Sequence, residues 1–155
     1  DAVPGYINAE VPELEDKTGG AGSLSIVQGA DFGYRAYGSG MFTSEKLIAE
    51  KPDLVARFTK AYLQAFQFVA ENPKEAVDIV IKLNPEYAAN DELLSKLTRS
   101  FFSDATKANG LGVITAQQWK ETAETLIAQE VLPKTASLTA GYDMRFQTAA
   151  KPVRR

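Results

Sequence analysis

A short stretch near the start of the chain, PGYINAE, gathers side chains that could bind a small polar molecule. Tyr6, Asn8 and Glu10 follow the turn-forming pair Pro4 and Gly5. A carboxylate accepts charge-assisted hydrogen bonds, an amide both donates and accepts, and a phenol offers a flat ring and a hydroxyl. A small heterocycle requires a few placed polar groups of this kind and flat apolar walls. We therefore predict that these three side chains contact a ligand.

Each of these residues also has a purely structural interpretation, which the sequence leaves open. Glu10 could be a solvated carboxylate at the start of a helix, where the helix dipole favours negative charge. Asn8 could cap the same helix. Tyr6 could lie in the core or at its rim.

A second candidate group lies in the segment YRAYGSG, where Gly38 and Gly40 flank Ser39 and follow Tyr37. Glycines allow a ligand or another backbone to come close. The alternative is a plain strand with a bulge. The GSG triplet is not a phosphate-binding loop, because no lysine followed by serine or threonine stands at the required offset.

The composition points to binding rather than catalysis. The 155 residues include no histidine and no cysteine, so a Ser-His-Asp or Cys-His hydrolase and a thiolate metal site are excluded within this chain. We expect no enzymatic activity, no cofactor and no metal. The acidic run of Glu13, Glu15 and Asp16 is predicted to be solvated or to touch a partner.

The length and the hydrophobic fraction of 45% are typical of one globular domain. A net charge of -3 gives no reason to expect nucleic acid or an anionic membrane as partner. No apolar run approaches the about 20 residues that span a bilayer.

The predicted elements are unevenly distributed. Extended segments are expected at 1–6, 23–28 and 34–43, and a short helix, interrupted or restarted at Pro12, at 7–17. Helices follow from caps and helix-starting prolines at Ser44 (or Thr43), Pro52, Asn72–Pro73, Asn90 and Thr115. Trp119 and the set Phe58, Phe66 and Phe68 are expected in the core, because they lie at helical spacing. Two or three short strands cannot complete a sheet by themselves.

Three stretches carry a resemblance to a known family. They are DAVPGYINAEVPELE at 1–15, YGSGMFTSEKLIAEKPDLVARFTKAYLQAFQFVAENPKEAV at 37–77, and GLGVITAQQWKETAETLIAQEVL at 110–132. Together they resemble the periplasmic solute-binding proteins of ABC importers, in the branch for thiamine pyrimidine precursors, which is related to the sulfonate, taurine and nitrate binders.

The resemblance implies an α/β fold, namely the helix-rich C-terminal part of a two-lobed type II periplasmic-binding-protein fold. Residues 1–31 would end the second lobe, 32–42 would form the hinge crossover, and 43–155 would supply the C-terminal helices of the first lobe and a tail. Short strands would complete sheets supplied by a missing N-terminal half, so this chain is expected to be a fragment. The crossover would place Tyr37 and Ser39 at the ligand cleft.

The implied function is capture of a small polar molecule, such as a pyrimidine thiamine precursor, between the lobes. Glu10 would accept a hydrogen bond from a pyrimidine amino group. The implied partners are this ligand, a membrane permease, and either the missing half or a self-paired copy, with a periplasmic or lipid-anchored extracytoplasmic location. The alternatives are a sulfonate or aromatic-acid binder, a helical interaction domain, or a pyrimidine-precursor-synthesising enzyme of the wider family, which uses a histidine and iron.

Overall fold

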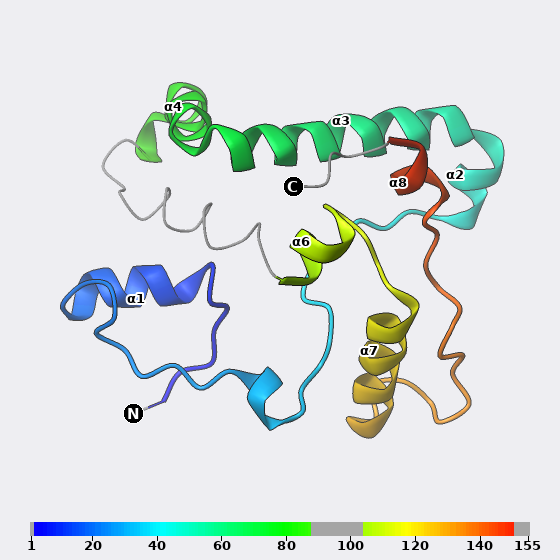
Figure 1. Cartoon of the computed structure of the whole chain (residues 1–155), viewed down its shortest axis with the longest axis horizontal. Coiled ribbons are helices and arrows are strands. Elements are labelled where there is room, and N and C mark those ends of the chain that lie inside the picture. The colour runs from blue at the N-terminus through cyan, green and yellow to red at the C-terminus, as the bar shows by residue number, and fades with distance from the viewer. Residues whose placement is uncertain (1, 88–103, 151–155) are drawn as a thin grey trace. The chain divides into compact units, whose positions relative to one another are not determined.

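The computed structural model describes residues 2–87 and 104–150, and every regular element within these ranges is helical (Figure 1). This confirms the prediction of a helix-rich chain. None of the described helices is long and apolar enough to cross a membrane. In chain order the elements are α1 (Glu10–Thr18), the 3₁₀ helix η1 (Gly29–Phe32), α2 (Glu45–Glu50), α3 (Pro52–Glu71), α4 (Pro73–Leu83), η2 (Pro85–Tyr87), α6 (Asp104–Asn109), α7 (Ala116–Ala128) and α8 (Arg145–Ala150).

The chain divides into two units, which we describe separately. The first contains Asp1–Ile26, Ala61–Leu111 and Pro152–Arg155, and the second contains Val27–Lys60 and Gly112–Lys151. The lobe and hinge boundaries predicted for the whole protein remain a prediction.

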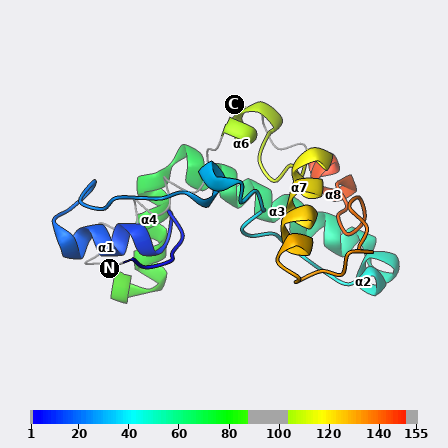
Figure 2. The same cartoon turned by 90° about the horizontal axis from the view of Figure 1, so that it is seen from below.

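In the first unit, α1 passes through Pro12 without a break. Proline is tolerated there because the amides of the first helical turn have no partner within the helix. The helix ends at Gly19, whose φ is +125°, and the chain then turns back (Figure 2). Glu15 holds this turn, since its Oε1 accepts a hydrogen bond from the Gly22 amide at 2.8 Å. Glu15 is only 5% exposed, so the prediction that it is solvated is wrong.

The starts of the central helices confirm the predictions made from local signals. The Ser44 hydroxyl accepts a hydrogen bond from the Leu47 amide at 3.1 Å and caps α2. Pro52 and Pro73 are the first residues of α3 and α4. Asn72 occupies the predicted cap position, but its side-chain amide donates to the Phe68 carbonyl at 3.2 Å instead of capping α4.

In the second unit, α7 begins as predicted at Thr115, whose hydroxyl accepts a hydrogen bond from the Gln118 amide at 3.2 Å. The helix predicted from Asn90 lies mostly outside the described residues. Its predicted end, which belongs to the first unit, is confirmed by α6, which stops at Asn109 before Gly110, where φ is +100°.

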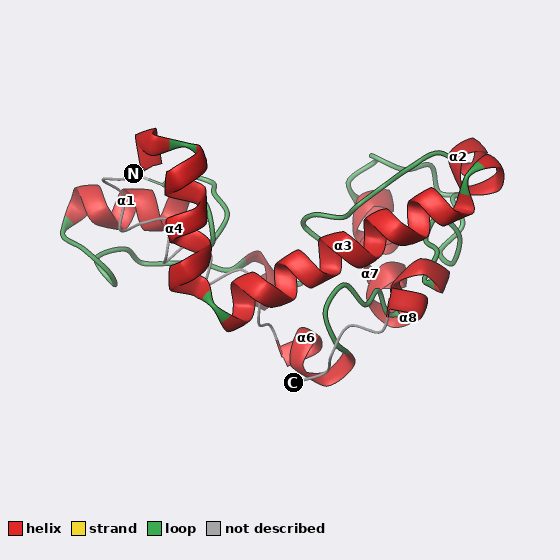
Figure 3. Cartoon of the chain, turned by 90° about the horizontal axis from the view of Figure 1, so that it is seen from above, coloured by secondary structure: helices red, strands yellow, loops and turns green. Residues whose placement is uncertain are grey.

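The predicted strands are not formed. No residue in the described parts of 1–6, 23–28 and 34–43 belongs to a strand (Figure 3). A strand requires a neighbouring extended segment to pair its amides and carbonyls, and the described residues provide no such ladder. The two-lobed sheet architecture therefore remains a prediction, while the helix-rich character is observed.

The described residues bury little hydrophobic side-chain surface. The buried hydrophobic residues are Leu63, Ala76 and Ala123. Phe58 is 58% exposed, so its predicted place in the core is wrong for this chain, and Phe66, Phe68 and Trp119 are only half-buried. Aromatic side chains at helical spacing are buried only where other elements cover the helix face.

Candidate ligand-binding site

The PGYINAE stretch folds into a tight turn that Glu10 closes. The carboxylate Oε2 of Glu10 accepts a hydrogen bond from the Tyr6 amide at 2.7 Å. The Tyr6 carbonyl in turn accepts from the Ala9 amide at 3.1 Å. Gly5 lies so close to this carboxylate side chain that a Cβ on it would be 2.9 Å from the Cβ of Glu10. The turn therefore needs glycine at position 5 and an acceptor at position 10.

This turn brings the Tyr6 backbone amide to the Glu10 carboxylate, and Asn8 lies between them in the chain. The Tyr6 side chain is 64% exposed and Glu10 is also exposed, whereas Asn8 is half-buried. An exposed aromatic ring can stack on a flat ligand, and an exposed carboxylate can accept a hydrogen bond from one. Glu10 has a structural task as well, because one of its oxygens holds the Tyr6 amide. Ligand contact by these residues stays a prediction.

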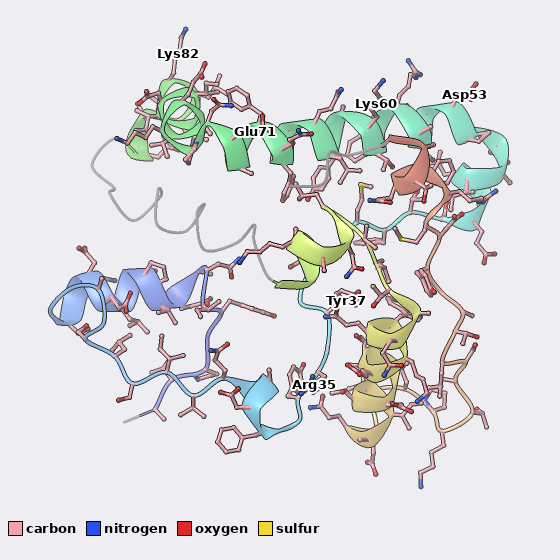
Figure 4. All side chains as sticks on the ribbon, viewed as in Figure 1. Arg35, Tyr37, Asp53, Lys60, Glu71 and Lys82 are labelled. Atoms are coloured by element: carbon pink, nitrogen blue, oxygen red, sulfur yellow. The ribbon has the colours of Figure 1, made fainter. Side chains whose placement is uncertain are left out.

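Tyr37 lies in the second unit and is attached to α7 at two points. Its amide donates to the Thr122 hydroxyl at 3.0 Å, and its phenolic oxygen accepts from the Thr115 amide at 3.1 Å. The residue is half-buried beside the first turns of α7, with Arg35 two residues earlier on the same segment (Figure 4). Ser39 follows on the exposed continuation of this segment. Their contact with a ligand also stays a prediction.

The threonines of α7 are residues that the sequence did not single out. Thr122 is 8% exposed and donates to the Gln118 carbonyl at 2.8 Å while it accepts from Tyr37. Thr125, one turn further on, donates to the Glu121 carbonyl at 2.8 Å and has a longer contact, 3.4 Å, with the Arg35 carbonyl. The available signal was the pair Thr122 and Thr125 within one helix, where threonine is a poor helix former.

The contacts of Trp119 on α7 were also not predicted from the sequence. The Trp119 indole N–H donates to the Ala140 carbonyl at 2.8 Å, and its ring packs on Tyr142 with centroids 5.3 Å apart. Beyond this contact, Arg145 forms an ion pair with Asp143 at 2.6 Å and holds the pKa of that carboxyl below its usual range, chiefly through hydrogen bonds. The described residues contain no cluster of acidic side chains suited to a metal ion.

Comparison with known proteins shows what the chain resembles. A family model described as NMT1/THI5 like matches residues 1–76. The riboflavin-binding protein RibY of Chloroflexus aurantiacus is 26% identical over 151 residues, which cover 94% of this chain and 43% of that protein. The formylaminopyrimidine-binding protein of Halalkalibacterium halodurans is 28% identical over 139 residues, which cover 85% of this chain and 41% of that protein. The predicted resemblance is confirmed.

The chain spans less than half the length of these two curated relatives. No solved structure matches it. Both relatives are named as binding proteins.

Proposed function

We propose that this chain is part of the solute-binding component of an ABC importer and that the whole protein captures a small nitrogen heterocycle. The observation that carries this proposal is the alignment of most of the chain with two relatives named for binding riboflavin and formylaminopyrimidine. The two compounds share a pyrimidine ring, which is fused into the flavin ring system in riboflavin. The ligand class that fits both names is therefore a flat pyrimidine or a fused pyrimidine.

The turn at residues 5–10 supports this ligand class. The exposed ring of Tyr6 offers a stacking surface for a flat heterocycle, and the adjacent Glu10 carboxylate offers an acceptor for an amino or ring N–H group. Because Glu10 already accepts from the Tyr6 amide, ligand binding and turn geometry are linked through one side chain. Asn8 adds a group that both donates and accepts.

Partners and location follow from the proposed role. A solute-binding component delivers its ligand to a membrane permease, so we propose a permease partner and an extracytoplasmic location, either periplasmic or lipid-anchored. The enzyme alternative has less support, because this chain contains no histidine and both relatives are named as binding proteins.

The test is calorimetric titration of the full-length gene product with riboflavin, a formylaminopyrimidine and taurine. The proposal expects binding of one of the two heterocycles. Glu10→Gln should weaken that binding about ten- to a hundredfold, because a charge-assisted hydrogen bond contributes about 1.5–3 kcal/mol and each factor of ten corresponds to about 1.4 kcal/mol. Glutamine keeps an oxygen that can accept from the Tyr6 amide, so the turn should persist.

Glu13→Gln provides the matched control. Glu13 stands one turn further along α1, is exposed and pairs with Lys17 at 2.6 Å, so the same substitution there should leave affinity within about twofold. Equal affinity in the Glu10→Gln variant would remove Glu10 from the site. Binding of taurine alone by the wild type would reject the pyrimidine assignment and leave the importer role.

A further inference from the structure

Tyr37 is held against α7 by hydrogen bonds at its backbone amide and at its phenolic oxygen. Its backbone amide meets the Thr122 hydroxyl, 85 positions away in sequence, and its phenolic oxygen meets the Thr115 amide, 78 positions away. A residue held at both backbone and side-chain tip has little freedom to change rotamer. The phenol that accepts from Thr115 still has a proton of its own, which it can donate to a ligand acceptor.

We infer that Thr122 is a positioning residue for ligand binding, acting through Tyr37; this inference rests on the proposed function. The Thr122 hydroxyl is buried and uses both of its capacities, donating to the Gln118 carbonyl and accepting from Tyr37. It thereby sets where the half-buried ring of Tyr37 lies against the first turns of α7. The ligand chemistry that suits this arrangement is a carbonyl oxygen, as found on the pyrimidine ring of riboflavin and on a formyl group.

Thr125 offers a matched control on the same helix. Both threonines donate to the carbonyl four residues before them at 2.8 Å. Only Thr122 also accepts from the Tyr37 amide. Because the single proton of Thr125 is directed to the Glu121 carbonyl, its 3.4 Å contact with the Arg35 carbonyl is weak. Substituting each threonine by valine removes the same intrahelical bond and preserves the shape, so the difference between the two variants isolates the Tyr37 contact.

The first measurement is amide hydrogen exchange in the ligand-free full-length protein. Thr122→Val should speed exchange of the Tyr37 amide about tenfold, because the amide loses its acceptor. Thr125→Val should change it by less than about threefold, and Thr122→Ser, which keeps the hydroxyl, should restore slow exchange. An unchanged exchange rate in Thr122→Val would overturn the inference without any ligand.

The second measurement is affinity for whichever heterocycle the wild type binds, riboflavin or a formylaminopyrimidine. Thr122→Val should weaken binding about tenfold, Thr122→Ser by less than about threefold, and Thr125→Val by less than about threefold. In a Tyr37→Phe background, Thr122→Val should have little further effect, because Thr122 acts on binding only by placing the phenol–ligand contact that phenylalanine lacks. A purely structural role would instead give additive losses in the double variant.

The outcomes separate the two claims. Faster exchange with unchanged affinity would overturn the positioning role while the proposed function stands, since the wild type binds. Additive losses in the Tyr37→Phe background would also overturn it. A wild type that binds neither heterocycle would reject the proposed function, and with it the part that Thr122 has in binding.

Discussion

Replacing Gly141 by alanine should destabilise the packing of the 137–143 loop on Trp119. Gly141 has a φ of +97°, and a Cβ at this position would lie 3.2 Å from Cζ2 of the Trp119 indole. The indole is held in place by its 2.8 Å hydrogen bond to the Ala140 carbonyl and by its packing on Tyr142. The ring therefore cannot move away from a new methyl group without loosening these contacts.

The expected magnitude combines three contributions. A left-handed backbone costs an L-residue about 1–2 kcal/mol. Displacing the indole weakens a hydrogen bond worth about 1 kcal/mol, because the new contact is shorter than the about 3.5–4.0 Å that carbon atoms prefer. Alanine also restricts the unfolded chain, which returns about 0.4–1 kcal/mol. The net loss in the free energy of unfolding should be about 1–2 kcal/mol.

Urea unfolding followed by tryptophan emission measures this loss directly, since Trp119 is the only tryptophan among the 155 residues. Gly33→Ala is the control. Gly33 lies in the same unit with a φ of +87°, and a Cβ there would meet nothing within 4 Å. It carries the backbone cost without the ring contact, so we expect Gly141→Ala to lose about 1 kcal/mol more and to shift the emission to longer wavelength.

Equal losses in the two variants would show that the methyl group does not disturb the indole, and the contact argument would fail. A Gly141→Ala protein as stable as the wild type would refute the backbone argument as well.

Two further predictions concern carboxylates. Glu15→Ala should lower the free energy of unfolding by about 1–3 kcal/mol, because the Gly22 amide loses its 2.8 Å acceptor, and this amide should exchange faster with solvent. Glu13→Ala, which removes the exposed ion pair with Lys17, should cost less than about 1 kcal/mol. Equal effects of the two substitutions would contradict the role of Glu15. Asp143 has a pKa lowered in the folded chain by hydrogen bonds from Arg145, so its contribution to stability should be present above about pH 4 and be lost as the pH falls through the folded pKa. Asp143→Asn should remove that part of the acid dependence in unfolding curves recorded between about pH 2 and 6, and an unaltered dependence would refute it.

The candidate site was predictable in part. Tyr6 and Glu10 are close in sequence and share one turn. Their proximity follows from the turn-forming pair Pro4–Gly5 and from the helix that starts at Glu10. The hydrogen bond from the Tyr6 amide to the Glu10 carboxylate was not predictable. Sequence patterns show which polar groups are near one another, but the angles of the turn decide which donor meets which acceptor.

Two predictions from the sequence, a strand at 23–28 and a core position for Phe58, were wrong for the same physical reason. Alternating residues at 23–28 predicted a strand, and helical spacing placed Phe58 in a core. Both patterns describe a face that becomes buried or paired when another element covers it. The described residues form no strand ladder, and Phe58 stays 58% exposed. A periodic pattern identifies a face that can be covered, and whether another element covers it depends on the tertiary structure.

The sequence by itself determined where the helices begin. Ser44, Pro52, Pro73 and Thr115 act within a single turn of chain, through a cap hydroxyl or a fixed φ, so their effect does not depend on the rest of the molecule. Only the tertiary structure decided that Tyr37 is held by α7. Its partners lie 78 and 85 positions away, and a threonine hydroxyl on a helix can bond to its own backbone without ever meeting another segment. The Thr122 hydroxyl meets the Tyr37 amide only because residues 35–37 pack on α7. No local sequence pattern contains that information.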